Sequence, residues 1–228
     1  MVGVLSAAAA ATAACSPKAD PADGKSSSPV SEQKPLTEAE LTDALPVGAD
    51  FPGFIAEPQA MPLLEAEDVV TVDKPACRPI ADMMSVRPEH PRQAMVWATI
   101  KANDAPSQET PGSVTLTSHT GQEAEAWMDE LKEALTNCTT FTATSERGWT
   151  HRFTIRPLPP VTAGDDSVTY LLTNALAPDG KGNVMTVVRT GGTFATYLMN
   201  QNTGKPVPIA ASLANQQHTK LQAIAAKP

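Results

Sequence analysis

The sequence has few aromatic residues, few cysteines and no excess of bases. Aromatic residues make up 4% of 228 residues, there are three cysteines, and 17 bases face 25 acids for a net charge of −8. A chain without a basic excess lacks the face with which general nucleic-acid binders meet phosphates, so no nucleic-acid partner is expected. No apolar run reaches the ~20 residues of a membrane-spanning helix, which excludes a polytopic membrane protein. The acidic excess lies in residues 36–68, which hold eight acids and no Lys or Arg.

Common catalytic and metal-binding motifs are also absent. The sequence contains no Gly-x-Ser-x-Gly, P-loop or His-Glu-x-x-His motif. Neither Cys-x-x-Cys nor His-x-x-x-His spacing occurs. The four histidines are far apart in the sequence, at His90, His119, His151 and His218. We therefore expect no cofactor, no metal site and no catalytic residue of a familiar kind.

The N-terminal segment is typical of an export signal. Residues 2–14 are uncharged, small and apolar, and they lead into Ala13-Ala14-Cys15. The stretch is too short to span a bilayer but suits the core of a signal peptide. Its end resembles a bacterial lipobox, whose cysteine is acylated, for example with palmitate, and becomes the mature N-terminus. The alternative is an Ala-rich N-terminus with an incidental cysteine.

The next segment predicts a tether. Residues 16–35 are rich in Pro, Ser, Lys, Asp and Gly, and Val30 is their one large apolar residue. Such a segment cannot bury enough surface to offset its chain entropy, so we expect it to be disordered. The organisation expected is a signal peptide and lipobox over 1–15, a tether over 16–35 and a globular domain over 36–228. The cell membrane, reached through lipidated Cys15, is then the first expected partner.

The remaining cysteines form a candidate pair. If Cys15 is lipidated, Cys77 and Cys138 are left, and an even number of cysteines in an exported domain favours a disulfide. Two buried free thiols are the alternative. The chain-entropy treatment gives about 4 kcal/mol for closing a loop of this length.

Local patterns predict four helices. Thr37 to Glu40 and Thr120 to Glu123 are capping boxes, which open helices to about residues 45 and 136. Pro79, in the first turn after Cys77, suits a short helix through Met84. A last helix is expected over about 208–226, with Leu213, Gln217, Leu221 and Ile224 on one side.

Most other segments predict strands. Residues 94–101, 114–118, 139–144, 149–155, 168–172, 184–189 and 193–199 are rich in residues that favour strands. The turns at 146–148 and 190–192 imply hairpins and therefore antiparallel pairing. Pro157 is expected to break the chain, and residues 62–76 have no clear periodicity. The fold class expected is α+β, an antiparallel sheet with helices packed on it in one domain.

Several short motifs occur in an order that points to one family. They are Leu45-Pro46-Val47-Gly48, Cys77 with Pro79, residues 134–141, Pro157-Leu158-Pro159, Gly164-Asp165-Asp166 and residues 187–192. Their order resembles that of the PknH-like extracellular sensor domains of actinobacterial lipoproteins and kinases. The resemblance covers about residues 36–226 and implies an extracytoplasmic domain with a disulfide and a ligand cleft. The kinase ectodomain is expected to carry two disulfides, whereas this chain can make one. No kinase motif is present, so signalling would need another protein.

The candidate ligand-binding residues are Arg152, Thr154 and Arg156. Alternate residues of a strand share a face, so two guanidinium groups and a hydroxyl would meet an anionic ligand there. A solvent-facing side of the sheet is the alternative. Adjacent Asp165 and Asp166 are interpreted as a solvated turn. The three tryptophans are interpreted as core residues, at Trp97, Trp127 and Trp149.

Three functions are consistent with these features. The first is a non-catalytic, membrane-anchored module that binds or senses an unknown small ligand or an envelope protein. The second is a cell-envelope hydrolase, which requires a Ser or Asp within hydrogen-bond reach of His119 or His151. The third is an envelope scaffold whose acidic residues 36–68 contact a basic partner.

Overall fold

The computed structural model describes residues 34–102, 112–175, 182–200 and 206–227. The strands are β1 (Phe54–Pro58), β2 (Val70–Val72), β3 (Ala94–Ala102), β4 (Gly112–Ser118), β5 (Thr140–Ser145), β6 (Thr150–Leu158), β7 (Asp166–Asn174), β8 (Gly182–Thr190) and β9 (Thr193–Asn200). The helices are α1 (Glu38–Ala44), α2 (Arg78–Asp82), α3 (Gly121–Asn137) and α4 (Ala211–Ala225), with a 3-10 turn, η1, at Pro75–Cys77.

The strands form one sheet in the order β1-β3-β4-β9-β8-β7-β6-β5-β2. Every pairing is antiparallel, so the predicted α+β fold with an antiparallel sheet in one domain is confirmed. Hairpins join neighbours from β5 to β9, whereas β9 also pairs with β4, far away in the sequence. The sheet therefore joins an N-terminal and a C-terminal group of strands through β4 and β9.

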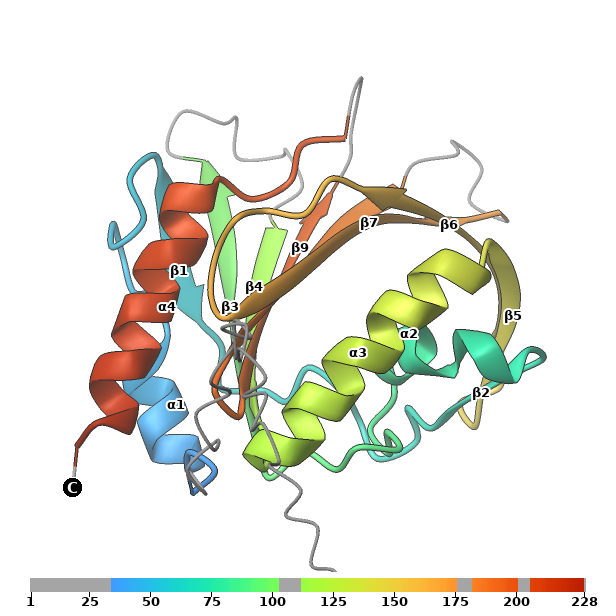
Figure 1. Cartoon of the computed structure of the whole chain (residues 1–228), viewed down its shortest axis with the longest axis horizontal. Coiled ribbons are helices and arrows are strands. Elements are labelled where there is room, and N and C mark those ends of the chain that lie inside the picture. Colours follow the sequence, from blue (N-terminus) through green and yellow to red (C-terminus); the bar gives the residue numbers. More distant parts are fainter. Residues whose placement is uncertain (1–33, 103–111, 176–181, 201–205, 228) are drawn as a thin grey trace, which may run out of the picture.

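Helices cover both faces of the sheet (Figure 1). The helices α2 and α3 pack on one face, and α1 and α4 pack on the other. In β8, Met185 and Val187 belong to the core under α3, whereas Val188 belongs to the core under α4. This alternation follows from the two-residue period of a strand whose two faces are both buried.

The two predicted capping boxes are present. The Thr37 hydroxyl accepts a hydrogen bond from the Glu40 backbone N–H, and the Glu40 carboxylate accepts one from the Thr37 backbone N–H. Thr120 and Glu123 make the same pair of contacts at the start of α3. These contacts satisfy N–H groups that have no partner inside a helix, and so they fix where α1 and α3 begin.

The disulfide between Cys77 and Cys138 is formed, with 5.4 Å between the two Cα atoms. Cys77 ends η1, and Cys138 is the C-terminal cap of α3. Both residues are buried in the same core. The bond therefore ties the beginning of α2 to the end of α3, and the predicted pairing of the two cysteines is confirmed.

Three sequence-based expectations about strands are wrong. The segments 54–58 and 70–72 are strands, although neither was expected to be one. Pro157 does not break the chain but lies inside β6, opposite Tyr170 of β7. Strand β5 pairs with β6 only as far as Thr154, so Pro157 has a strand neighbour on one side alone. A proline is tolerated there because its missing N–H has no strand partner to serve.

Candidate ligand-binding site

A pocket of about 210 Å³ lies over the sheet face that carries α2 and α3. Its floor comes from four adjacent strands, β3, β4, β9 and β8, and its walls come from the loop between β1 and β2 and the segment between α2 and β3. The lining residues are Leu63, Leu64, Met83, Met84, Arg92, Met95, Ser113, Thr115, Thr117, Met185, Thr196 and Leu198. We call this cavity the methionine pocket.

Methionine dominates the apolar part of the lining. Four of the eight methionines in the chain line this one cavity, at Met83, Met84, Met95 and Met185. Methionine side chains are unbranched and polarisable, so they adapt to ligands of different shape more readily than branched side chains do. Leucines complete the apolar surface. A lining of this kind suits an apolar ligand group whose outline is not rigid.

The floor of the pocket also carries hydroxyl groups. Ser113, Thr115 and Thr117 alternate along β4, so all three side chains point to the pocket side of the sheet. The Thr117 hydroxyl is 3.1 Å from Nε2 of His119. Within the part of the chain that the structure describes, the side-chain hydroxyls of Ser113, Thr115 and Thr196 have no hydrogen-bond partner. They are available to a ligand.

Arg92 is the charged residue of the pocket wall. Its Nη1 and Nη2 atoms donate hydrogen bonds of 2.5 Å and 2.7 Å to the main-chain carbonyls of Ser85 and Asp82. Burial lowers the pKa of the Arg92 guanidinium to about 10, against the opposing effect of the Asp82 charge. The guanidinium is still protonated at neutral pH, so a desolvated positive charge lies at the edge of an apolar pocket.

The nearby carboxylate of Asp82 is already occupied. Asp82 is buried, and its Oδ1 lies 2.5 Å from Nε of Arg78. Its Oδ2 accepts a hydrogen bond of 2.8 Å from the Glu89 backbone N–H. Among the described residues, no carboxylate lies within ion-pair distance of Arg92. The guanidinium groups of Arg78 and Arg92 thus share the field of the single carboxylate of Asp82, so these three side chains together carry one net positive charge.

His119 is buried beside the pocket and does not form the dyad that a hydrolase would need. Its Nδ1 is 3.0 Å from the Pro91 carbonyl oxygen, and its Nε2 meets the Thr117 hydroxyl instead of a Ser or Asp. Burial, followed by the charge of Arg92, lowers the pKa of His119 to about 4. An imidazole with so low a pKa is a weak general base at neutral pH. The nitrogen Nδ1 of His151 is buried without a partner among the described residues.

A wider groove adjoins the methionine pocket. It has a volume of about 650 Å³ and is bordered by α1, the segment 58–63 and β3. Leu63 and Met95 line both cavities. Trp97 lines the groove and donates its indole N–H to the Met61 carbonyl oxygen at 2.8 Å.

The predicted ligand residues Arg152, Thr154 and Arg156 share one exposed face of β6, as their spacing predicted. Their neighbours Phe153 and Ile155 point the other way, into the core under α3. The methionine pocket is on that other side of the sheet. The structure therefore brings the three residues together with one another but not with the pocket.

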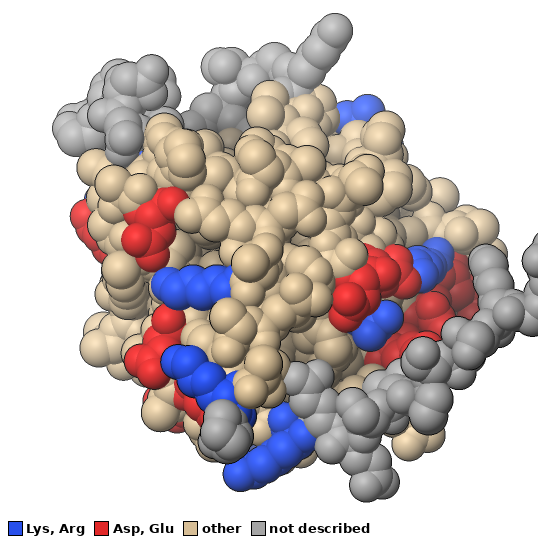
Figure 2. Space-filling model, turned by 60° about the vertical axis from the view of Figure 1, so that its left-hand side comes forward, with Lys and Arg blue, Asp and Glu red and all other residues tan. Residues whose placement is uncertain are grey.

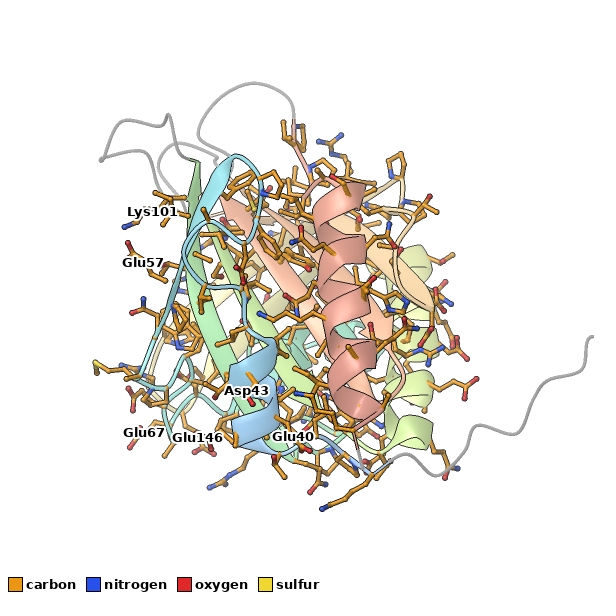
Figure 3. The ribbon with its side chains drawn as sticks, turned by 90° about the vertical axis from the view of Figure 1, so that its left-hand side faces the viewer. Glu40, Asp43, Glu57, Glu67, Lys101 and Glu146 are labelled. Carbon is orange, nitrogen blue, oxygen red and sulfur yellow. A yellow bond between two sulfur atoms is a disulfide. The ribbon has the colours of Figure 1, made fainter. Side chains whose placement is uncertain are left out.

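The acidic residues of 36–68 are spread over several elements. Glu40 lies in a capping box, Asp50 is 3.3 Å from Lys220, and Asp68 is 3.3 Å from Arg147. Figure 3 shows Glu57 pointing toward Lys101 of the neighbouring strand, from which it is 3.3 Å away. Figure 2 shows acidic and basic side chains interspersed on the face that it draws. Three of the eight acids of this segment, Asp50, Glu57 and Asp68, thus have a basic partner within the described residues.

Asp165 and Asp166 do not act as a carboxylate pair. Asp165 accepts a hydrogen bond of 2.6 Å from the Gly191 backbone N–H, whereas Asp166 forms an ion pair with Lys132. That hydrogen-bonded carboxylate raises the pKa of Lys132. In residues 34–227 as described, no three His, Cys, Asp or Glu side chains cluster as a metal site. Trp127 is fully buried, as predicted, while Trp97 and Trp149 are half-buried.

The signals expected at the N-terminus lie outside the described residues. They include Cys15 and nearly all of the tether. Among the residues that are described, no helix is long and apolar enough to cross a membrane.

Comparison with known proteins finds similarity in structure alone. The chain matches no protein-family model, and no curated protein is significantly similar to it in sequence. It is similar to the extracellular domain of PknH from Mycobacterium tuberculosis, with a TM-score of 0.51, 16% identity, and coverage of 86% of this chain and 100% of that one. It is also similar to an uncharacterised Mycobacterium smegmatis protein, the Rv0999 ortholog, with a TM-score of 0.38, 12% identity, and coverage of 82% and 95%.

The first of these similarities supports a shared fold, and the second is too slight to carry an argument. The family resemblance noted in the sequence is thus matched at the level of the fold by one extracellular domain. The residues of the methionine pocket, by contrast, were not identified from the sequence. The doublets Leu63-Leu64 and Met83-Met84 were the available signal, since both are apolar pairs at positions outside any long periodic element.

Proposed function

We propose that the chain is an extracytoplasmic, lipid-anchored module that binds or senses a ligand and has no catalytic activity of its own. The observation that carries this proposal is the methionine pocket, a largely apolar cavity with hydroxyl groups on its floor and one charged group at its wall. Pockets of this composition are the usual form of small-molecule sites. The disulfide is consistent with an oxidising compartment, and the fold is similar to that of a kinase's extracellular domain.

The anchor proposed is an acyl group on Cys15. The segment from Cys15 to residue 35 would separate the pocket from the membrane surface by roughly 25 Å, from the root-mean-square length of a flexible chain. A module held at that distance can meet molecules that leave or enter the membrane. Without a kinase motif, it would pass its signal to another envelope protein.

A non-catalytic role is favoured over a hydrolase. The hydrolase hypothesis depends on a nucleophile or acid beside His119 or His151, and His119 instead contacts Thr117 and the Pro91 carbonyl group. Its lowered pKa opposes proton abstraction at neutral pH. A scaffold that uses the acids of 36–68 is less favoured, because Asp50, Glu57 and Asp68 are paired within the chain.

The exposed residues Arg152, Thr154 and Arg156 are proposed as a separate contact surface for an anionic group. This surface lies on the sheet face away from the methionine pocket, so the two sites would act independently. Replacing both arginines with glutamine should leave binding in the pocket unchanged.

The test is recovery of bound molecules from the native envelope. The full-length protein and a Ser113→Phe variant are purified under identical mild conditions, and the molecules released on denaturation are compared by mass spectrometry. Ser113 is half-buried on the pocket floor, so phenylalanine fills the cavity without removing a core contact. A molecule retained by the wild type and lost from Ser113→Phe supports the proposal. Identical extracts, or none from either protein, contradict it.

A further inference from the structure

The methionine pocket has a positive charge at its wall and no negative charge to match. Arg92 uses two of its five N–H groups for the carbonyls of Ser85 and Asp82. The other three have no partner within the part of the chain that the structure describes. A guanidinium that keeps free donors beside an apolar cavity is suited to bind a carboxylate or phosphate, because such charge-assisted hydrogen bonds are strong in a poorly solvated site.

The acids around Arg92 are used elsewhere. The Asp82 carboxylate is bound by Arg78 and by the Glu89 backbone, and Glu130 lies 2.9 Å from His90. The Glu123 carboxylate accepts the capping hydrogen bonds of Thr120 at the start of α3. None of these carboxylates lies within ion-pair distance of Arg92, although the charge of Asp82 still acts on it. The charge balance of this region would be completed by an anion that enters from the pocket.

The shape of the cavity restricts what else that anion carries. About 210 Å³ is small beside the ~300–1,000 Å³ of common ligand pockets, so it takes one flexible chain rather than two. The four methionines and the leucines supply the apolar surface for that chain. The adjoining groove of about 650 Å³ shares Leu63 and Met95 with the pocket, so a longer chain would extend along it.

We propose that the methionine pocket binds a single-chain anionic amphiphile, with its carboxylate or phosphate head at Arg92 and its hydrocarbon chain among the methionines. This inference rests on the proposed function of a ligand-binding module and names the class of its ligand. A free fatty acid and a lysophospholipid whose head group is a phosphate both have one hydrocarbon chain and an anionic head. They differ in the head group, which allows an experiment to separate them.

The first experiment compares head groups on one chain length. Dodecanoate, dodecyl phosphate, dodecanol and dodecyltrimethylammonium are titrated into the wild-type protein below their micelle concentrations, with calorimetry as the readout. The two anions are expected to bind about tenfold or more tightly than the alcohol, because a hydrogen bond to a charged group is worth at least that factor. The cation is expected to bind least. The stronger of the two anions identifies the head group.

The second experiment tests the assigned residues. Arg92→Gln is expected to bring the affinity for the anions down to that for dodecanol, and Arg92→Lys to restore part of the difference. The matched control is Arg87→Gln, which removes an exposed arginine nearby and should change nothing. Ser113→Phe should weaken all four probes together. Thermal unfolding of each variant shows whether it is folded. If Arg92→Gln is not folded, the head-group series on the wild type together with Ser113→Phe tests the proposal.

The outcomes separate this inference from the proposed function. Equal affinities for the anions and the alcohol, or anion binding unchanged in Arg92→Gln, overturn the inference. If the native envelope yields a neutral molecule that Ser113→Phe fails to retain, the ligand class is wrong but the binding function stands. If neither the probes nor any native molecule depends on Ser113, the pocket is not a binding site and both proposals fail.

Discussion

The guanidinium of Arg92 lies over the ring of Trp127, with 5.4 Å between its Cζ atom and the ring centroid. Trp127 is fully buried on the inner face of α3, and its indole N–H donates to the Pro79 carbonyl oxygen at 3.2 Å. His119 packs edge-on against the same ring at 5.3 Å. One aromatic residue therefore connects the wall of the methionine pocket with the main core of the protein.

This contact predicts an optical signal for binding. An anion that pairs with Arg92 changes the electric field at the Trp127 indole, so the fluorescence emission should shift when dodecanoate is added. Trp127→Phe should abolish the shift, whereas Trp97→Phe and Trp149→Phe should leave it in place. A shift that persists in Trp127→Phe would show that the ligand is bound elsewhere.

The buried His119 predicts a loss of stability in mild acid. Its pKa is about 4 in the folded chain and 6.5 in the unfolded one, so the unfolded state binds more protons between these values. The free energy of unfolding is therefore highest, as far as His119 decides it, above pH 6.5. It falls as the pH drops toward 4, by up to about 3 kcal/mol. The titratable groups that act on the ring are Arg92, Glu123 and His90.

Urea unfolding at pH 7.5 and 4.5 measures this effect. His119→Asn should be less stable than the wild type at pH 7.5 and show a smaller drop in stability between the two pH values. His218→Gln serves as the control and should keep the wild-type drop. A His119→Asn variant with the full drop would assign the acid sensitivity to other groups.

The Cys77–Cys138 disulfide should contribute strongly to stability. A loop with a sequence separation of 61 residues corresponds to about 4 kcal/mol in the chain-entropy treatment. The double variant Cys77→Ser with Cys138→Ser should therefore unfold at a clearly lower urea concentration, and a reductant should lower the wild-type midpoint similarly. In denaturant without reductant, neither cysteine of the wild type should be alkylated.

The buried hydroxyl of Tyr197 predicts a stabilising substitution. This hydroxyl has no hydrogen-bond partner among the described residues, although the ring is fully buried in the core under α4. An unsatisfied buried polar group costs about 1–3 kcal/mol, so Tyr197→Phe should raise the free energy of unfolding by about 1 kcal/mol. Tyr197→Ala should lower it by about 3 kcal/mol or more. A destabilised Tyr197→Phe would mean that the hydroxyl has a partner.

The proposed anchor predicts where a cysteine variant is found. Cys15→Ala should move the protein from the membrane fraction to the soluble fraction, because the acylated residue is lost. Cys77→Ser with Cys138→Ser should stay membrane-bound if it is folded. Metabolic labelling with a palmitate analogue measures the acyl group directly, and a labelled Cys15→Ala protein would contradict the proposal.

Local patterns predicted much of the fold. The capping boxes located α1 and α3 because a Thr and a Glu three residues apart satisfy their own backbone groups. The strand β2 was not predicted because a segment of three residues is too short to show an alternating pattern. The strand β1 was not predicted because it contains Glu57 and Pro58, which are uncommon in strands. Both are edge strands, and their pairing with β5 and β3 defines them more than their own composition does.

The candidate site was harder to predict than the fold. The spacing of Arg152, Thr154 and Arg156 correctly gave a shared face, because the period of a strand is local information. The methionine pocket instead combines the loop between β1 and β2, the segment between α2 and β3, and strands that are distant in the sequence. The role of Arg92 depends on the occupation of the Asp82 carboxylate by Arg78, and no sequence pattern indicates that contact.

The pairing of β4 with β9 also constrains the order in which the protein can fold. Ser113 lies opposite Leu198, so the middle of the sheet stays open until the chain has been made as far as β9. Contacts between segments so distant in sequence form slowly, since a long loop must close first. The pocket floor spans this junction between β4 and β9, so the pocket is complete only after β9 has joined the sheet.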